Sequence, residues 1–280
     1  LLIDNRKEKK TKKQLEEEQL IKDFITATDN FVVYRPSFRL HTLLAGYPWF
    51  LDWGRDSLIS FEGLLLVTKR FDIAKEVLQT LVRDIKFGLV PNGYSGFDNR
   101  PLYNSVDASL LLFEQIQKYV EYTEDYEFVK ENLYEKLKDV IENYKNGIDV
   151  DDNNIYLDTD YLIVSGTQNT QNTWMDAKCN NKAVTPRNGK AVEINSLWYN
   201  ANIIMADLEN KIGNKNDAKK YQELARKCKK AFNEKFYNKK RKCLYDVIGD
   251  AKIRPNQLFS MSLTYQVIDT NSEAVSYTHL

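Results

Sequence analysis

Apolar side chains recur at helical spacing in one segment after another, and this periodicity constrains the fold of the chain more than any other feature. One face of a helix over residues 71–87, for example, would carry Ile73, Val77, Leu78, Leu81 and Ile85. The same pattern predicts helices over residues 12–30, 57–69, 71–87, 105–123, 126–149, 192–212, 214–237 and 255–267, with a short extended stretch around 153–164. Because the helices do not alternate with strands, we predict an all-α fold and not a parallel α/β sheet.

The predicted helices differ in how much of their surface is apolar. The stretches "LISFEGLLLV" and "ASLLLFE", in the helices over 57–69 and 105–123, have almost no polar face, which is typical of buried helices. The helices over 71–87, 126–149 and 214–237 carry many more charges and would face solvent. This alternation predicts pairs of one inner and one outer helix, as in an α/α toroid or another array of helical pairs.

The loops that precede every second helix are rich in aromatic and charged side chains. They read "WFLDWGRD", "GYSGFDNRPLYNSVD", "NTWMDAKCNNKAVTPRNGKAVEIN" and "GDAKIRPNQ". By contrast, the loops "TKRFD" and "GNKND" are ordinary polar turns. In an alternating array, the loops that enter inner helices lie at one end of the molecule. We therefore expect the four polar-aromatic loops to converge on one functional site.

Composition excludes several classes of function. The 280 residues carry 40 basic and 40 acidic side chains, so we expect no nucleic acid partner. Three widely spaced cysteines and two histidines predict no metal site, no redox pair, no Ser-His-Asp triad and no cofactor. No apolar run approaches the roughly 20 residues that cross a bilayer, and the first residues lack the apolar core of a signal peptide. With an odd number of cysteines, this predicts a cytoplasmic protein without a membrane partner.

The four loops combine the two kinds of side chain that a sugar-binding pocket needs. Sugars have apolar faces, which stack on aromatic rings, and hydroxyl edges, which bind carboxylates, amides and arginine. The aromatic candidates are Trp49, Trp53 and Trp174, and the polar candidates are Arg55, Asp56, Arg187, Lys190, Glu193, Arg254, Asn256 and Gln257. With few histidines, the remaining chemistry is that of carboxylates, and glycoside hydrolysis uses two of them.

Asp176 is the candidate for a catalytic acid. It follows Trp174 and Met175, and apolar neighbours would favour the protonated carboxyl group that an acid needs. The alternative for Asp176 is a helix N-cap. For Asp56 the alternatives are a contact to a sugar hydroxyl, an ion pair with Arg55, or a charge favoured at the start of a helix.

Three further residues have both a structural and a functional interpretation. Glu193, early in the helix over 192–212, would either contact a ligand or cap the helix. Trp198 would lie mainly in the core, with one ring edge toward the site. Asp107 would cap the helix over 105–123. Burial and hydrogen-bond partners decide between these alternatives.

Four stretches resemble one known family: "AGYPWFLDWGRDSLIS", "NTWMDAK", "TPRNGKAVEINSLWYNA" and "RPNQLFSMSL". They resemble the glycogen debranching enzyme family, in its bacterial and archaeal type, over the amylo-α-1,6-glucosidase domain. The resemblance covers roughly residues 30–267. It implies an (α/α)6 toroid that hydrolyses the α-1,6-linked glucose at a trimmed branch, with inversion at the anomeric carbon. Glycogen or a branched α-glucan would then be the partner of the protein.

The same resemblance implies roles for individual residues. Asp176 of "TWMDA" corresponds to the general acid. Trp53, Arg55 and Asp56 of "DWGRD" correspond to the pocket for the terminal glucose. The motifs "PRNGKAVE" and "RPNQ" would line the same site with Arg187, Lys190, Glu193, Arg254, Asn256 and Gln257.

The chain departs from the family pattern in two ways. About eight helices are predicted where the family toroid has twelve, and the family's general base, a Glu in a motif of the form "SEIFDG", has no counterpart here. Members of the family carry an N-terminal β-rich domain, whereas this chain opens on "LLIDNRKEKK", where we expect at most a remnant of it; "SEAVSYTHL" also breaks from the pattern. We therefore expect a fragment, with a helix or linker remnant over 1–30, a partial glucosidase domain over 31–269 and a non-native or disordered tail over 270–280. Alone, it is expected to show negligible hydrolysis.

Two other functions fit the same residues. One is that of another toroid glycosidase, such as a relative of glucoamylase or trehalase. The other is a non-catalytic helical module that binds glycans. The second is disfavoured because a repeat scaffold does not need aromatic rings beside carboxylates in four separate loops.

Overall fold

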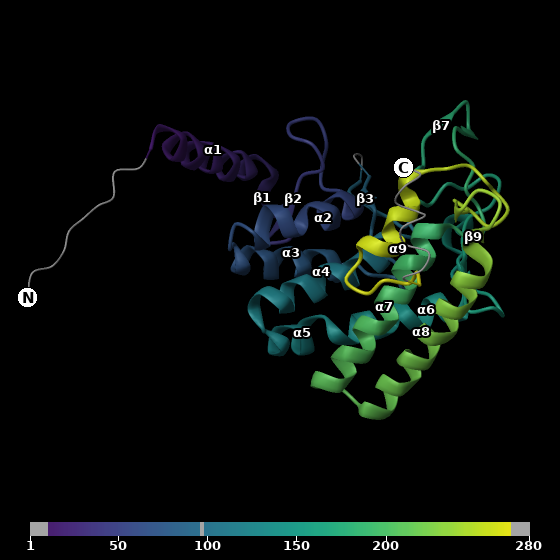
Figure 1. Ribbon diagram of the computed structural model, residues 1–280. Coiled ribbons are helices and arrows are strands. Elements are labelled where there is room, and N and C mark those ends of the chain that lie inside the picture. Colours follow the sequence, from purple (N-terminus) through teal and green to yellow (C-terminus); the bar gives the residue numbers. More distant parts are fainter. Residues whose placement is uncertain (1–10, 96–97, 270–280) are drawn as a thin grey trace, which may run out of the picture.

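The computed structural model describes residues 11–95 and 98–269, which are mostly helical. The helices are α1 (Lys12–Thr28), α2 (Gly54–Phe61), α3 (Phe71–Arg83), α4 (Ala108–Thr123), α5 (Tyr126–Asn132), α6 (Tyr134–Asn146), α7 (Val192–Ile212), α8 (Lys215–Phe236) and α9 (Phe259–Ser262). Within these residues, no helix has the length and apolar character needed to cross a bilayer. The predicted all-α class is confirmed (Figure 1).

The strands are short, and each pairs only with its neighbour in sequence as an antiparallel hairpin. The pairs are β1 (Val32–Arg35) with β2 (Leu40–Leu43), β3 (Gly93–Tyr94) with β4 (Pro101–Leu102), β5 (Tyr156–Leu157) with β6 (Ile163–Val164), β7 (Lys178–Cys179) with β8 (Lys182–Ala183), and β9 (Tyr237–Asn238) with β10 (Cys243–Leu244). In the part of the chain that the structure describes, the hairpins therefore lie in the connections between helices and form no extended sheet.

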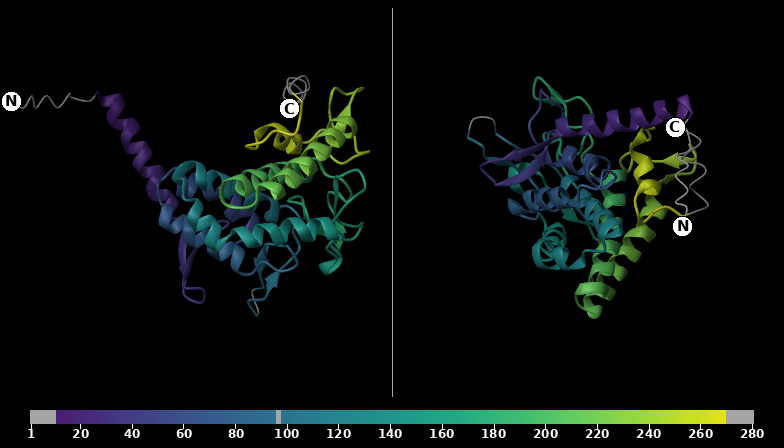
Figure 2. Two further views of the ribbon diagram at one scale, coloured as in Figure 1. Left: turned by 90° about the horizontal axis from the view of Figure 1, so that it is seen from below. Right: turned by 90° about the vertical axis from the view of Figure 1, so that its left-hand side faces the viewer.

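The helices form an inner and an outer layer. Along the inner layer α2 contacts α4, α4 contacts α7, and α7 contacts α9, while α3, α6 and α8 lie outside them. Figure 1 and Figure 2 show α7 and α8 running side by side as one such pair. The alternation predicted from the apolar pattern is confirmed, and the described helices form an arc of an α/α toroid.

Burial explains why the two layers differ in composition. Phe113 and Ile116 of α4 are fully buried, as are most of their neighbours in that helix. Burying such a side chain contributes about 1.5–3 kcal/mol relative to leaving it exposed. The outer helix α8 buries a single stripe, made of Ala218, Tyr221, Ala225, Cys228, Ala231, Phe232 and Phe236. Trp198 of α7 is fully buried and stacks on Tyr144, so it belongs to the core.

The first inner helix begins three residues earlier than predicted, at Gly54. An alanine Cβ at Gly54 would lie 2.3 Å from the carbonyl oxygen of Pro91, so only glycine fits this close approach. The amide of Gly54 also donates to the carbonyl of Asn92 over 2.9 Å. The helix continues into a π-helical turn, Glu62–Leu66. These contacts place Arg55 and Asp56 of the "DWGRD" motif in the first turn of α2, directly after Trp53.

Two other predicted helices differ from the structure. The helix predicted over 126–149 is divided into α5 and α6 at Leu133, whose φ of −121° and ψ of −35° leave the helical range. The helix predicted over 255–267 is a 3₁₀ turn, Pro255–Leu258, followed by the single turn of α9. It ends because tertiary partners replace the helical ones: Thr264 donates its backbone N–H to Glu114 and Tyr265 donates to Asn200.

Helix α1 stands apart from the arc. It projects away from the other helices in Figure 1 and Figure 2, and none of its residues is buried. Its apolar side chains Leu15, Leu20, Ile21, Phe24 and Ile25 are 44–64% exposed. The division of the chain into a helix or linker remnant over residues 1–30 and a domain over 31–269 stays a prediction. The tail predicted over 270–280 lies outside the described residues.

Candidate functional site

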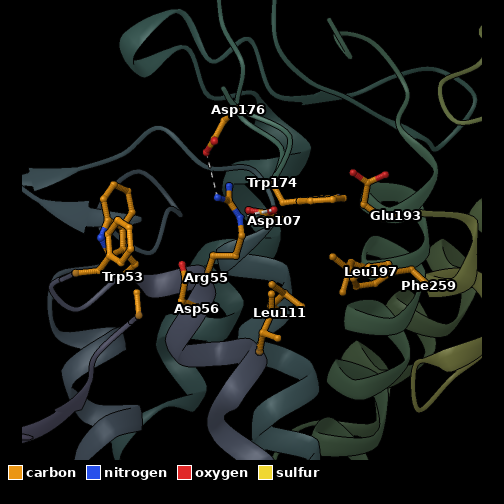
Figure 3. Close-up of a pocket in the computed structure, with 13 residues that line it drawn as sticks. Trp53, Arg55, Asp56, Asp107, Leu111, Trp174, Asp176, Glu193, Leu197 and Phe259 are labelled. Carbon is orange, nitrogen blue, oxygen red and sulfur yellow. Dashed lines mark hydrogen bonds and ion pairs between the residues drawn. The ribbon is translucent and has the colours of Figure 1, made fainter. Parts of the chain in front are cut away.

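A cavity of about 520 Å³ opens where the inner helices begin (Figure 3). Its walls come from three of the polar-aromatic loops, from the helices that follow them, and from α9. They are formed by Ala45, Phe50, Trp53, Arg55, Asp56, Ile59, Asp107, Leu111, Trp174, Asp176, Glu193, Leu197 and Phe259. Three of the four predicted loops therefore meet at one cavity, and the fourth reaches it only through Phe259 of the helix that follows it.

Arg55 is held at the first turn of α2 by three oxygen acceptors. Its Nε donates to Asp107 Oδ2 over 2.7 Å, its Nη1 to Asp176 Oδ2 over 3.1 Å, and its Nη2 to Ser105 Oγ over 3.4 Å. Burial alone would lower the pKa of the guanidinium. The carboxylates of Asp107 and Asp176 outweigh burial and raise that pKa, so Arg55 stays charged in the cavity.

Asp176 extends into the site from the loop between Trp174 and β7. Figure 3 shows its carboxylate directed at Arg55 from the side opposite α2. The side chain of Asp176 is 38% exposed, so it is more open to solvent than the apolar surroundings expected from Trp174 and Met175 would make it. The helix N-cap alternative does not apply, because the adjacent element is the β7–β8 hairpin.

Asp107 lines the cavity, and the capping interpretation of this residue is wrong. No side-chain hydrogen bond from Asp107 caps α4; instead, the amide of Ala108 donates to Ser105 Oγ over 3.2 Å. The carboxylate of Asp107 is 4% exposed and binds Arg55 and the hydroxyl of Ser105. Its position in the aromatic and polar loop before an inner helix was the available signal.

Asp56 lies on the cavity wall next to Arg55 in sequence, but the guanidinium turns to Asp107 and Asp176 instead. The ion-pair alternative for Asp56 therefore finds no direct hydrogen bond. Partial loss of water around Asp56 raises the pKa of its carboxyl group, and the positive charge of Arg55 opposes this rise. Asp56 is thus a solvent-facing carboxylate available to a ligand.

Trp53 and Trp174 contribute rings to different parts of the cavity. In Figure 3, Trp53 lies on the side of the cavity away from Glu193, and the ring of Trp174 extends toward Glu193. A Cβ at Gly93 would come within 3.3 Å of the Trp53 ring, so this ring packs on bare backbone. Trp174 is 44% exposed, and its Nε1 donates to Asn256 Oδ1 over 2.8 Å. Two aromatic surfaces of this kind suit the apolar faces of a sugar.

Glu193 belongs to a buried ion-pair network beside the cavity. Arg187 binds both oxygens of Glu193, with Nη2 donating to Oε2 over 2.6 Å, and it also donates to Asp246 over 2.8 and 3.0 Å. Burial would lower the pKa of Arg187, but Glu193 and Asp246 outweigh it and raise that pKa. Arg187 is therefore a charged scaffold residue behind Glu193, and Asp246 is a partner that sequence reasoning missed.

Six predicted site residues do not line the cavity; Arg187 and Asn256 lie directly behind it, and the other four have partners elsewhere or face solvent. Trp49 is 84% exposed on the loop outside it. Lys190 turns to Asp158 and Asp160, at 2.7 and 2.6 Å. Gln257 accepts from the backbone of Leu244 over 3.2 Å. Arg254 binds Asp246 and Asp250. The structure thus brings together Trp53, Arg55, Asp56, Trp174, Asp176 and Glu193, with Arg187 and Asn256 directly behind them.

The arc of paired helices and the cavity at its loop end define the class of the protein. The same fold occurs in a rhamnosidase from Klebsiella oxytoca, with a TM-score of 0.55, 13% identity, and coverage of 74% of this chain and 37% of that chain. It also occurs in a GH78 family rhamnosidase from Bacillus sp. GL1, with a TM-score of 0.58, 12% identity, and coverage of 92% and 26%. The protein is thus a helical domain of the kind these rhamnosidases contain.

The chain belongs to the amylo-alpha-1,6-glucosidase family, whose model matches residues 26–278. It is also similar to the glycogen debranching enzyme of Saccharomyces cerevisiae, with 27% identity over 63% of this chain and 15% of that protein. The chain therefore spans about 15% of the length of this curated relative. The family suggested by the four motifs is confirmed.

Proposed function

We propose that the cavity binds the terminal glucose of an α-glucan branch and serves an amylo-α-1,6-glucosidase reaction. One arrangement supports the proposal: Asp176 and the rings of Trp53 and Trp174 face the same cavity, with Arg55 fixed beside them. A volume of about 520 Å³ lies within the roughly 300–1,000 Å³ typical of small-molecule sites. Family membership directs the choice of sugar to α-1,6-linked glucose in glycogen or a similar branched glucan.

In the proposed reaction, Asp176 gives its proton to the glycosidic oxygen while the bond from that oxygen to the anomeric carbon breaks. A water molecule attacks the anomeric carbon from the opposite face and loses a proton to a second carboxylate, so the configuration inverts. We assign the transferable proton to Asp176 Oδ1, because Oδ2 accepts a hydrogen bond from Arg55. Arg55 would therefore orient the acid rather than exchange protons itself.

The base is the part of the reaction that the cavity supports least. Asp107 and Glu193 line the cavity, but each carboxylate already holds an arginine. Asp56 is the remaining carboxylate in the cavity wall, and we assign it to sugar hydroxyls. The "SEIFDG" motif is missing from the sequence. We therefore propose that these 280 residues bind glucosides without hydrolysing them.

Calorimetric titration with isomaltose and a glucose-release assay on a branched limit dextrin test the two parts separately. We expect isomaltose to bind the 280-residue chain, with glucose release no higher than that of its Asp176→Asn variant. In a longer protein that carries this sequence, Asp176→Asn should lower glucose release by orders of magnitude while binding persists. A chain that does not bind isomaltose would contradict the proposed site, and rapid glucose release would contradict the missing base.

The same assays separate the alternatives. A glucoamylase-like or trehalase-like enzyme would prefer α-1,4 or α,α-1,1 substrates over α-1,6 substrates. A glycan-binding module would bind without turnover in the longer protein too, so Asp176→Asn would remove nothing. We further propose a cytoplasmic location, because Cys179, Cys228 and Cys243 are all unpaired, as thiols are in a reducing compartment.

A further inference from the structure

Asp246 lies behind the cavity and binds side chains from two of the site motifs. Its carboxylate is 1% exposed. Oδ2 accepts from Arg187 Nε over 2.8 Å and from Arg254 Nη1 over 2.5 Å. Oδ1 accepts from Arg187 Nη2 over 3.0 Å and from Asn256 Nδ2 over 2.7 Å. Two arginines and one amide thus fix a single buried carboxylate.

Backbone hydrogen bonds also hold Asp246 in place. Its carbonyl oxygen accepts from the amide of Val192, the first residue of α7, over 3.0 Å. The neighbouring residue Val247 bridges to Ala191, the residue before that helix. These backbone contacts therefore fix the position of Asp246 relative to the start of α7, where Glu193 lines the cavity.

This carboxylate decides which way the amide of Asn256 points. A carboxylate only accepts hydrogen bonds, so it takes the NH₂ end of the Asn256 amide. The oxygen end is then presented to Trp174 Nε1, which can only donate. If position 246 also offered a donor, the amide could turn over and place its NH₂ group against the indole N–H. The orientation of Asn256, and with it the position of Trp174, thus depends on the charge at Asp246.

We propose that Asp246 is a positioning residue for the sugar site: through Asn256 it fixes the indole of Trp174 at the angle at which the ring lines the cavity. Asp246 does not line the cavity itself. Trp174 is 44% exposed, so packing alone leaves its ring room to turn, and the bond to Asn256 supplies the missing restraint. This inference rests on the proposed function in so far as the ligand is a glucoside.

The test compares Asp246→Asn with Asp250→Asn in the 280-residue chain. Asp250 also binds Arg254, over 3.3 Å, but it does not contact Asn256, so it is a matched control. The first measurement is the indole N–H resonance of Trp174 in an ¹⁵N spectrum, assigned by its loss in Trp174→Phe. The second is the affinity for isomaltose. For Asp246→Asn we expect a shifted, faster-exchanging indole proton and affinity about fivefold to tenfold weaker.

A double-mutant comparison gives the result that a purely structural role would not produce. In a Trp174→Phe background the indole donor is gone, so Asp246→Asn should weaken isomaltose binding by less than about twofold further. If Asp246→Asn does not fold, Asn256→Ala replaces it, with the same expected shift and loss. Either variant overturns the proposal if the Trp174 resonance is unchanged, or if it shifts while affinity stays at the wild-type value.

The proposed function can fail separately. If wild type does not bind isomaltose, the glucoside site is wrong and the positioning role for it falls too. A shifted Trp174 resonance in Asp246→Asn would in that case still show the link between Asp246 and the indole. Equal effects of Asp246→Asn and Asp250→Asn would instead point to a general loosening of Arg254 and would overturn the specific role of Asp246.

Discussion

Asp107 holds Arg55 through a buried hydrogen bond of 2.7 Å from Nε to Oδ2, and this pair joins the starts of two inner helices. Arg55 is in the first turn of α2, and Asp107 directly precedes α4. The other edge of the same guanidinium binds Asp176. One arginine therefore connects the scaffold to the proposed acid.

We expect Asp107→Asn to lower both stability and affinity. The asparagine keeps one acceptor but removes the charge that balances a buried arginine, which should lower the free energy of unfolding by about 1–3 kcal/mol. With Arg55 less firmly held, isomaltose should bind more weakly. Denaturant unfolding and calorimetric titration of the same preparation measure the two effects.

The control for Asp107→Asn is an ion pair on the surface. Glu223 binds Arg226 three residues further along α8, where both side chains are exposed. Solvent screens such a pair, so Glu223→Gln should leave the unfolding midpoint and the affinity unchanged. Equal losses from Asp107→Asn and Glu223→Gln would show that burial of the Arg55 pair has no special role.

We expect Asp56→Asn to change the pH dependence of folding stability slightly and to change isomaltose affinity more strongly. The pKa of Asp56 is raised above its ordinary value of 3.8 by partial desolvation, so the folded state holds this proton more tightly than the unfolded state. The contribution of Asp56 to stability therefore falls as pH rises through the raised pKa. Asparagine carries no charge at any pH, so the variant should be slightly more stable at pH 7, and the difference should vanish below about pH 3.

The effect on stability should be small because Asp56 faces solvent. Its effect on ligand binding should be larger, since the carboxylate lines the cavity and binds no arginine directly. Thermal unfolding from pH 3 to pH 7 and titration with isomaltose at pH 7 measure the two. An Asp56→Asn variant that is less stable at pH 7 than at pH 3, relative to wild type, would reverse the sign argued here.

The layers of the fold could be predicted because the information is local. Helical spacing of apolar residues marks each helix, and the amount of charge on a helix marks it as inner or outer. The convergence of the loops follows from that alternation alone. The prediction of a helix over 255–267 was wrong because contacts with distant residues override the local apolar pattern. The helix stops where Thr264 donates its backbone N–H to Glu114, which is 150 residues away in sequence.

The sequence predicted several of the residues that line the cavity, but it did not predict the hydrogen-bond partners of the site residues. "DWGRD" and "TWMD" do supply cavity residues, whereas Lys190 of "PRNGK" turns away to Asp158 and Asp160. Nothing in the sequence beside Lys190 marks those carboxylates as its partners, which lie 32 and 30 residues away. Asp246 was missed for the same reason, since its partner Arg187 is 59 residues away.

The three cysteines provide a test of the packing around α8. Cys179 is exposed, whereas Cys228 and Cys243 are buried, and burial raises the pKa of both buried thiols. Because the thiolate is the reactive form, one thiol should react rapidly with Ellman's reagent in the native protein and three after unfolding in guanidinium. Cys179→Ser serves as the control and should remove the rapid phase. Two rapidly reacting thiols in the wild type would contradict the burial of Cys228 on α8 or of Cys243 on β10.

Gly54 and Gly63 form a matched pair for testing how α2 is placed. A Cβ at Gly54 would lie 2.3 Å from the carbonyl oxygen of Pro91 and 3.3 Å from a methyl group of Val90, whereas a Cβ at Gly63 would meet nothing within 4 Å. Gly54→Ala should therefore lower the free energy of unfolding by about 1–3 kcal/mol, because backbone must move to admit the methyl group. Gly63→Ala should be neutral or raise it by up to about 1 kcal/mol, since alanine favours the helical turn.

The displacement of α2 in Gly54→Ala should also weaken ligand binding. Moving the first turn of α2 shifts Arg55, which directly follows Gly54 and binds Asp107 and Asp176. Isomaltose affinity should fall in Gly54→Ala and stay at the wild-type value in Gly63→Ala. Denaturant unfolding and titration of both variants measure this. If Gly54→Ala lost stability but bound isomaltose as well as wild type, the close approach to Pro91 would support the fold without setting the geometry of the site.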